Sequence, residues 1–163
     1  MDLSKFKLED LFFTAIKAEI DSKEAYSIMA GITRNAFLKD RFKFLADEEE
    51  KHRTLLTKEF VRQLPGVKLA LPKVSPVPLP EIDIKNERIA MSELLSQAMA
   101  AEKAAQEFYL SFAKHVGKSN FAITLGYFAM MEEGHYELLK REKAAEEEFE
   151  AYDDFNPGMH LGP

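Results

Sequence analysis

The sequence predicts an all-α protein with the architecture of a four-helix bundle, and the placement of proline is the first reason. Residues 1–64 contain no proline, and five of the seven prolines lie between positions 65 and 80. On either side of that segment, apolar residues recur three and four positions apart, which is the spacing of one buried helical face. We therefore expect one domain over residues 1–163, with two helices before the proline-rich segment and two after it.

The first pair of helices is expected within residues 5–64. A first helix over residues 8–30 carries its apolar residues on one face and ends near Gly31. A second helix begins after Asn35, a residue type that caps helix N-termini, and ends at Leu64, because a proline follows. The short turn between the two helices predicts an antiparallel hairpin.

The second pair is expected within residues 91–151. A third helix covers residues 92–117, and a fourth begins at Ser119 or Asn120 and ends near position 150. Another short turn predicts a second antiparallel hairpin. Residues 152–163 are then a C-terminal tail.

The segment at positions 65–90 differs from the two turns in length and composition. Its first part is rich in proline, and an extended proline-rich chain advances about 3.1 Å per residue, enough to run the length of a bundle. We expect this segment to be a crossover that returns the chain to the same end of the bundle. The second and third helices are then parallel.

Composition excludes several classes of function. The net charge of −6 and the lack of a Lys/Arg run argue against a nucleic-acid partner. The chain has no cysteine, so disulfides, zinc fingers and Cys-ligated iron–sulfur clusters are excluded. The most apolar stretch, residues 121–131, is too short to cross a membrane, and the N-terminus lacks the layout of a signal peptide. We expect a soluble cytoplasmic protein with no membrane partner.

An internal repeat is the strongest pattern in the sequence. Residues 15–26 align with residues 98–109, and residues 46–56 align with residues 129–139, at one offset of 83 positions and without an insertion. The two hairpins are therefore copies of one helical unit.

Each copy carries a glutamate on its first helix and a Glu-x-x-His motif on its second. Residues three apart share one face of a helix, so each motif directs a carboxylate and an imidazole to the same side. Two divalent cations would balance four buried carboxylates, which unpaired would be severely destabilising, and neutral imidazoles would complete the ligand set. The sequence therefore predicts a dinuclear metal site with the ligands Glu19, Glu49, His52, Glu102, Glu132 and His135.

Single motifs of this kind also arise by chance in a glutamate-rich sequence, on a solvated face. The remaining histidines, His115 and His160, lack a glutamate three positions before them. Tyr26 and Tyr109 lie seven residues after Glu19 and Glu102, on the same helix faces. Two interpretations of the tyrosines stay open: core packing, or a hydrogen bond to a ligating carboxylate that tunes the metal.

These residues resemble the ferritin-like superfamily, and most closely its rubrerythrin branch. The resemblance covers both hairpins and rests on the two Glu-to-Tyr segments, 19–26 and 102–109, and on the two Glu-x-x-His motifs. It implies a ferritin-like fold with a non-haem di-iron site, in which Glu49 and Glu132 bridge the metals and the other four residues are terminal ligands. Manganese is a possible alternative, because oxygen and nitrogen ligands suit both metals.

Two departures from the family pattern limit what the resemblance implies. Rubrerythrins carry a rubredoxin domain whose cysteines hold an electron-transfer iron, and this chain has no cysteine. Electrons must then come from an external donor protein. Peroxide-reducing rubrerythrins also have a further glutamate three residues after the third-helix ligand, where this chain has Ala105.

The expected function is a di-iron oxidoreductase of peroxidase or ferroxidase type that reduces O2 or hydrogen peroxide, in a chain that forms a homodimer. The alternatives are iron storage of the ferritin type, which requires a cage, a di-manganese site like that of a catalase, and a helical partner-binding module with a vestigial site. For the enzyme, the catalytic residues are expected to be Glu19, Glu49, Glu102, Glu132, Tyr26 and Tyr109.

Overall fold

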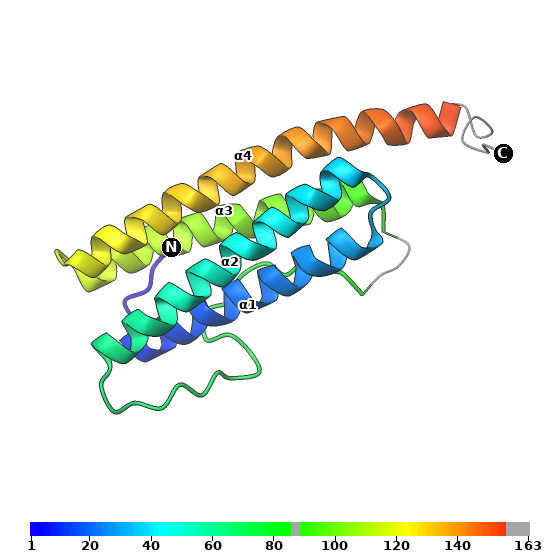
Figure 1. Cartoon of the computed structure of the whole chain (residues 1–163). Helices are drawn as coiled ribbons and strands as arrows, with labels where there is room; N and C mark the ends of the chain where they lie inside the picture. The colour runs from blue at the N-terminus through cyan, green and yellow to red at the C-terminus, as the bar shows by residue number, and fades with distance from the viewer. Residues whose placement is uncertain (86–88, 156–163) are drawn as a thin grey trace.

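The computed structural model describes residues 1–85 and 89–155, and in these ranges it contains four helices and no strand. The helices are α1 (Leu8–Ile32), α2 (Ala36–Gln63), α3 (Met91–Val116) and α4 (Asn120–Phe155). They lie side by side as a bundle of two hairpins, α1 with α2 and α3 with α4 (Figure 1). The predicted four-helix bundle is confirmed.

Local capping explains where α2 begins. The side-chain oxygen of Asn35 accepts hydrogen bonds from the backbone N–H groups of Phe37 and Leu38, at 3.1 and 3.2 Å. These are two of the N–H groups that have no partner inside a helix at its first turn. The turn into α2 is therefore set by residues that are adjacent in the sequence, and the predicted start is confirmed.

The turn between α3 and α4 depends on Gly117, which has a φ of 67°. This backbone conformation is costly for residues with a Cβ atom and free of that cost for glycine. The chain therefore leaves α3 at this glycine and reverses within three residues, before α4 begins.

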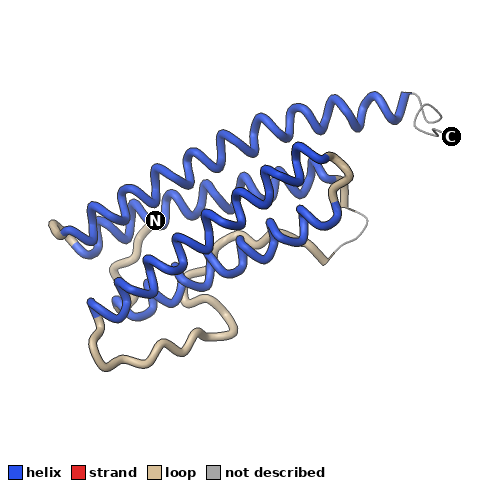
Figure 2. Tube along the Cα trace, in the orientation of Figure 1, coloured by secondary structure: helices blue, strands red, loops and turns tan. Residues whose placement is uncertain are grey.

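The crossover returns the chain along the whole bundle, and α2 and α3 run in the same direction (Figure 1). It follows the side of the bundle formed by α1 and α3 and contains no helix or strand in its described part (Figure 2). The backbone N–H of Val77 donates a 3.1 Å hydrogen bond to the Thr14 hydroxyl, which itself donates to the carbonyl of Asp10. Thr14 and Val77 are buried, so this contact fixes the crossover to α1.

The fourth helix continues to Phe155, beyond the predicted end near position 150. Glu150 accepts hydrogen bonds from the backbone N–H and the hydroxyl of Ser92, at 3.1 and 2.6 Å. The carboxylate thereby caps the start of α3 from a neighbouring helix. The helix thus extends into the segment predicted as tail, and residues 156–163, including His160, lie outside the described residues.

The apolar core has two clusters, and on every helix a buried glutamate lies between the clusters, accompanied on α2 and α4 by a buried histidine. The first cluster is formed mainly by the start of α1, the end of α2, the end of α3 and the start of α4. The second is formed by the end of α1, the starts of α2 and α3, and Leu139 in the middle of α4. Among the described residues no helix combines the length and hydropathy that a membrane span requires. Apolar packing does not explain the buried polar side chains between the two clusters, which we call the polar layer.

Candidate metal centre

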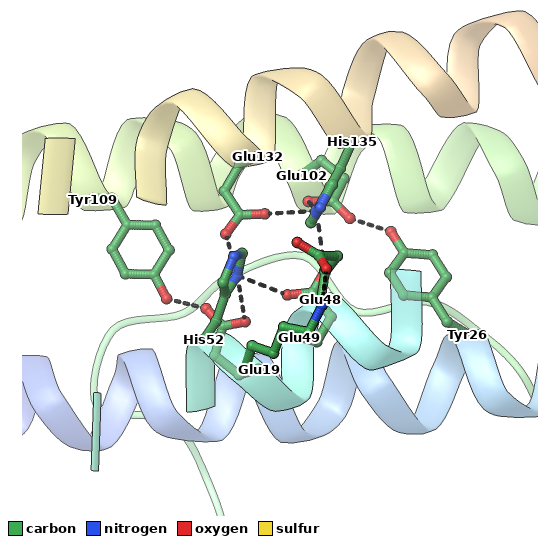
Figure 3. A network of polar contacts seen from close by, with 10 residues as sticks. Glu19, Tyr26, Glu48, Glu49, His52, Glu102, Tyr109, Glu132 and His135 are labelled. Carbon is green, nitrogen blue, oxygen red and sulfur yellow. Dashed lines mark hydrogen bonds and ion pairs between the residues drawn. The ribbon is translucent and has the colours of Figure 1, made fainter. Parts of the chain in front are cut away.

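The polar layer consists of six buried side chains contributed by all four helices. Each is at most 5% exposed, although carboxylates and imidazoles are rarely buried without a partner. The helices α1 and α3 contribute one glutamate each, and α2 and α4 contribute one Glu-x-x-His motif each (Figure 3). The structure brings together all six residues that the sequence predicted as ligands: Glu19, Glu49, His52, Glu102, Glu132 and His135.

Helical spacing explains why these residues share one layer. Glu49 and His52, like Glu132 and His135, are three positions apart and so lie on the same face of their helix. On each helix the polar position falls on the apolar stripe, between residues of the first cluster and residues of the second. Packing of the four stripes therefore carries the six side chains into the centre of the bundle.

The first half of the site surrounds His52. Its Nδ1 atom lies 3.4 Å from Glu19 Oε2, 3.2 Å from Glu49 Oε2 and 3.2 Å from Glu132 Oε1. Ligand-type atoms of these four residues all lie within 4.8 Å of one another. Atoms bonded to one small divalent ion at about 2.1 Å have comparable separations.

The second half surrounds His135 in the same way. Its Nδ1 atom lies 3.3 Å from Glu49 Oε1, 3.6 Å from Glu102 Oε2 and 3.2 Å from Glu132 Oε2. Glu49 and Glu132 thus contact both histidines with different oxygens, and they belong to both groups of four. Two adjacent positions for a cation share these two carboxylates.

The orphaned polar atoms test whether the residues fit a metal pair. Among the described residues, Glu49 Oε1, Glu132 Oε1, His135 Nδ1 and both His52 nitrogens are buried without a hydrogen-bond partner. Leaving such atoms unsatisfied costs about 1 to 3 kcal/mol each. All of these atoms except His52 Nε2 converge on the two cation positions. Oxygen and imidazole donors suit iron and manganese alike. The residues fit a pair of divalent cations.

Two tyrosines join the layer across the seam between the hairpins. Tyr26 of α1 donates a hydrogen bond to Glu102 Oε1 of α3, and Tyr109 of α3 donates one to Glu19 Oε1 of α1 (Figure 3). Both tyrosines are at most 1% exposed. Of the two interpretations, the geometry supports the hydrogen bond to a candidate ligand, and in each case the carboxylate belongs to the opposite hairpin.

The four carboxylates divide into two kinds. Burial raises the pKa of Glu19 and of Glu102 well above the ordinary value, and the negative charge of Glu49 raises both further. Burial also acts to raise the pKa of Glu49, but contacts with the two histidines outweigh it, so the pKa lies far below its usual range. The pKa of Glu132 is lowered by contacts with the same histidines, against burial and the charge of Glu49. The environment of the two shared carboxylates thus favours their charged form, and that of Glu19 and Glu102 favours the neutral form.

The surrounding carboxylates raise the pKa of both histidines in the metal-free site. Burial lowers the pKa of His52, but Glu132, Glu19 and Glu49 more than compensate and raise it to about 12. The pKa of His135 is raised in the same way by Glu102, Glu132 and Glu49. The neutral imidazoles predicted from charge balance belong to the metal-bound protein, because an imidazole nitrogen must lose its proton before it binds a cation.

Burial raises the pKa of Tyr26 and of Tyr109 well above the usual value, and the negative charge of Glu102 and of Glu19, respectively, raises it further. Both hydroxyls therefore keep their protons and can donate to the carboxylates. The remaining described histidine, His115, is exposed and lies outside the layer, as its lack of a motif predicted.

One neighbour of the layer was not identified from the sequence. The ring of Phe128 lies 4.9 Å from the His52 ring, tilted by 45°, and 5.3 Å from the Tyr109 ring. The position equivalent to Phe128 in the first hairpin is Leu45, so the repeat itself gave no signal. Phe128 covers the His52 half of the layer with apolar surface.

Comparison with known proteins agrees with the site geometry. A model of the family described as Rubrerythrin matches residues 10–143. A solved structure of a hypothetical protein from Pyrococcus furiosus is similar to this chain, with 32% sequence identity, a TM-score of 0.77 and coverage of 91% of this chain and 95% of the other. No curated protein matches the chain.

Proposed function

The chain belongs to the rubrerythrin family, and from this premise we propose that it is a non-haem di-iron oxidoreductase that reduces O2 or hydrogen peroxide. The observation that carries the proposal is the sharing of Glu49 and Glu132 between two groups of four donors. A mononuclear site would need only one such group. Two cation positions bridged by carboxylates suit a reaction that requires two electrons at one place.

Two iron ions bound there would supply two electrons in total, which together with two protons reduce one hydrogen peroxide to two water molecules. The role of the protein in this chemistry is to hold the donor side chains and to orient them. Tyr109 and Tyr26 fix the carboxylates of Glu19 and Glu102 through hydrogen bonds, and such outer contacts set ligand orientation and basicity. Phe128 limits the access of water to His52, which is fully buried.

Electrons for repeated turnover come, in this proposal, from another protein. The chain has no cysteine and so cannot hold the thiolate-bound iron that serves as the second redox centre in rubrerythrins with a rubredoxin domain. Ala105 takes the position of the additional glutamate of the peroxide-reducing members, which leaves the set of six donors as the whole candidate site.

The test is anaerobic loading of the metal-free protein with Fe(II), followed by elemental analysis and by separate additions of O2 and hydrogen peroxide. We expect elemental analysis to find two irons per chain. We also expect at least one of the two oxidants to oxidise them, which is measured as a rise in ferric absorbance. Loading with Mn(II) in parallel is the control for the other metal. Evolution of O2 from peroxide by the manganese form alone would instead assign a catalase-like reaction, and absence of stoichiometric metal would overturn the proposal.

A size measurement separates this proposal from iron storage. We infer a homodimer, and light scattering should then give the mass of two chains. A particle many times heavier, with more than two irons per chain, would favour a storage cage.

A further inference from the structure

The two cation positions of the polar layer differ in their contact with solvent. The two shared glutamates belong to both positions, and the side chains of Glu19 and Glu102, one for each position, are equally exposed at 4%. The histidines are not equivalent in this way. The His52 side chain is 0% exposed, and the His135 side chain is 7% exposed. Contact with water thus distinguishes the two positions at their histidines.

The buried nitrogen atoms show the same difference. Among the described residues, both nitrogens of His52 are buried without a hydrogen-bond partner, whereas of the His135 nitrogens only Nδ1 is. The Nδ1 atom of each ring faces the carboxylates (Figure 3). The exposed part of the His135 ring therefore lies away from the carboxylates, on the side of the ring that can meet water.

The residues that cover the two imidazoles also differ between the copies of the repeat. The buried ring of Phe128 lies 4.9 Å from the His52 ring, and its equivalent in the other copy is Leu45, which has no ring. On the outer side of α4, the residue before His135 is Gly134, which is exposed and has free space where a Cβ atom would lie. The His52 position is thus enclosed by the core, and the His135 position lies next to a bare helix surface.

This difference bears on how cations reach the layer. A cation passes between water and a site by stepwise exchange of water molecules for protein donors, so exchange requires water at a donor. The apolar shell around a metal site controls that access. Water already touches the His135 ring, whereas water at His52 would require Phe128 or its neighbours in the first cluster to move.

We propose that cations enter and leave the polar layer at the His135 position, and that Phe128 keeps the His52 position closed. The inference rests on the proposed function for the presence of a metal pair. The repeat makes the two positions equivalent in their donors, and their surroundings make them unequal in exchange. One metal per chain therefore exchanges rapidly with solvent, and the other is retained.

The first test follows metal loss from protein loaded with two Mn(II) ions per chain. In solution, excess EDTA should remove one manganese per chain about tenfold faster than the other. Crystals of the loaded protein, soaked in EDTA for increasing times, assign the two phases, because the anomalous scattering of manganese reports the occupancy of each position. We expect the His135 position to empty first. Equal loss from both positions, or earlier loss at His52, would overturn the inference.

The second test replaces the cover of His52 by the residue type of the other copy, in Phe128→Leu. We expect this variant to bind two manganese ions and to lose the retained one about tenfold faster than the wild type. Phe121→Leu is the matched control, because it removes a ring from the same cluster that packs against Phe12 and Phe112, and it should keep the slow phase. An unchanged slow phase in Phe128→Leu, or equal acceleration in both variants, would overturn the role of Phe128.

Failure of the proposed function gives a different result from failure of this inference. Wild-type protein without a metal pair would overturn the proposed function. A complete pair that empties evenly from both positions would overturn only the inference about His135 and Phe128.

Discussion

Tyr109 of α3 donates its hydroxyl hydrogen bond to Glu19 of α1, so that each hairpin orients a candidate ligand of the other. The reciprocal contact, from Tyr26 to Glu102, is its counterpart in the repeat. Both carboxylates have a raised pKa because of their burial, and both depend on a donor that comes from the opposite half. The two hairpins are therefore joined through the site as well as through the apolar clusters.

Replacing either tyrosine by phenylalanine should weaken metal binding without abolishing it. Loss of a hydrogen bond to a ligand typically costs about 10- to 100-fold in metal affinity. Competition with a chelator of known affinity measures the change for Tyr109→Phe and Tyr26→Phe. Tyr127→Phe, at an exposed position on α4, is the control, and unchanged affinity in both site variants would mean that the tyrosines serve packing alone.

The shared glutamates should be essential for both metal positions. In Glu49→Gln or Glu132→Gln one oxygen donor and one negative charge are lost from both groups of four, so we expect elemental analysis to find less than one metal per chain. Glu133→Gln, next to Glu132 but exposed, is the matched control and should bind two metals. Stoichiometric metal in both shared-glutamate variants would exclude the bridging arrangement.

Metal binding should release protons, and acid should weaken it. Burial raises the pKa of Glu19 and Glu102, and neighbouring carboxylates raise the pKa of His52 to about 12 and that of His135 above its usual value. In the metal-free protein these shifts favour the protonated form of all four groups. Each proton must leave before its group binds a cation, so up to four protons are released per metal pair and affinity rises with pH. Calorimetry in two buffers of different ionisation enthalpy measures this number, and identical heats would contradict it.

The cap that α4 provides for α3 should contribute to stability. Glu150→Ala removes both hydrogen bonds to Ser92, and we expect the free energy of unfolding in urea to fall by about 1 kcal/mol. Hydrogen exchange should increase at the first turn of α3. Glu148→Ala, at an exposed position two residues earlier, is the control, and equal stability of the two variants would show that the cap contributes nothing.

The helix boundaries that the sequence predicted correctly depend on local interactions. Asn35 caps α2 with its own side chain, and Gly117 ends α3 through its own backbone conformation. The contact between Glu150 of α4 and Ser92 of α3 was not predicted, because these residues are far apart in the sequence. No local pattern carries such a contact.

The six residues of the polar layer were predictable because the repeat contains the motif twice, and because residues three apart share one face of a helix. The pairing of each tyrosine with the carboxylate of the other hairpin was not, because it depends on how the hairpins dock. The raised pKa of His52 follows from its distances to carboxylates on three helices, which the sequence leaves undefined.

Glu49 and Glu132 each serve both groups of donors, and this has a consequence for the history of the repeat. Duplicated units often become redundant, so that one copy tolerates damage while the other works. Here neither hairpin contains a complete set of donors, and a lost glutamate in one copy removes a partner from both cation positions. Duplication has therefore produced two halves that depend on each other for a complete set of donors.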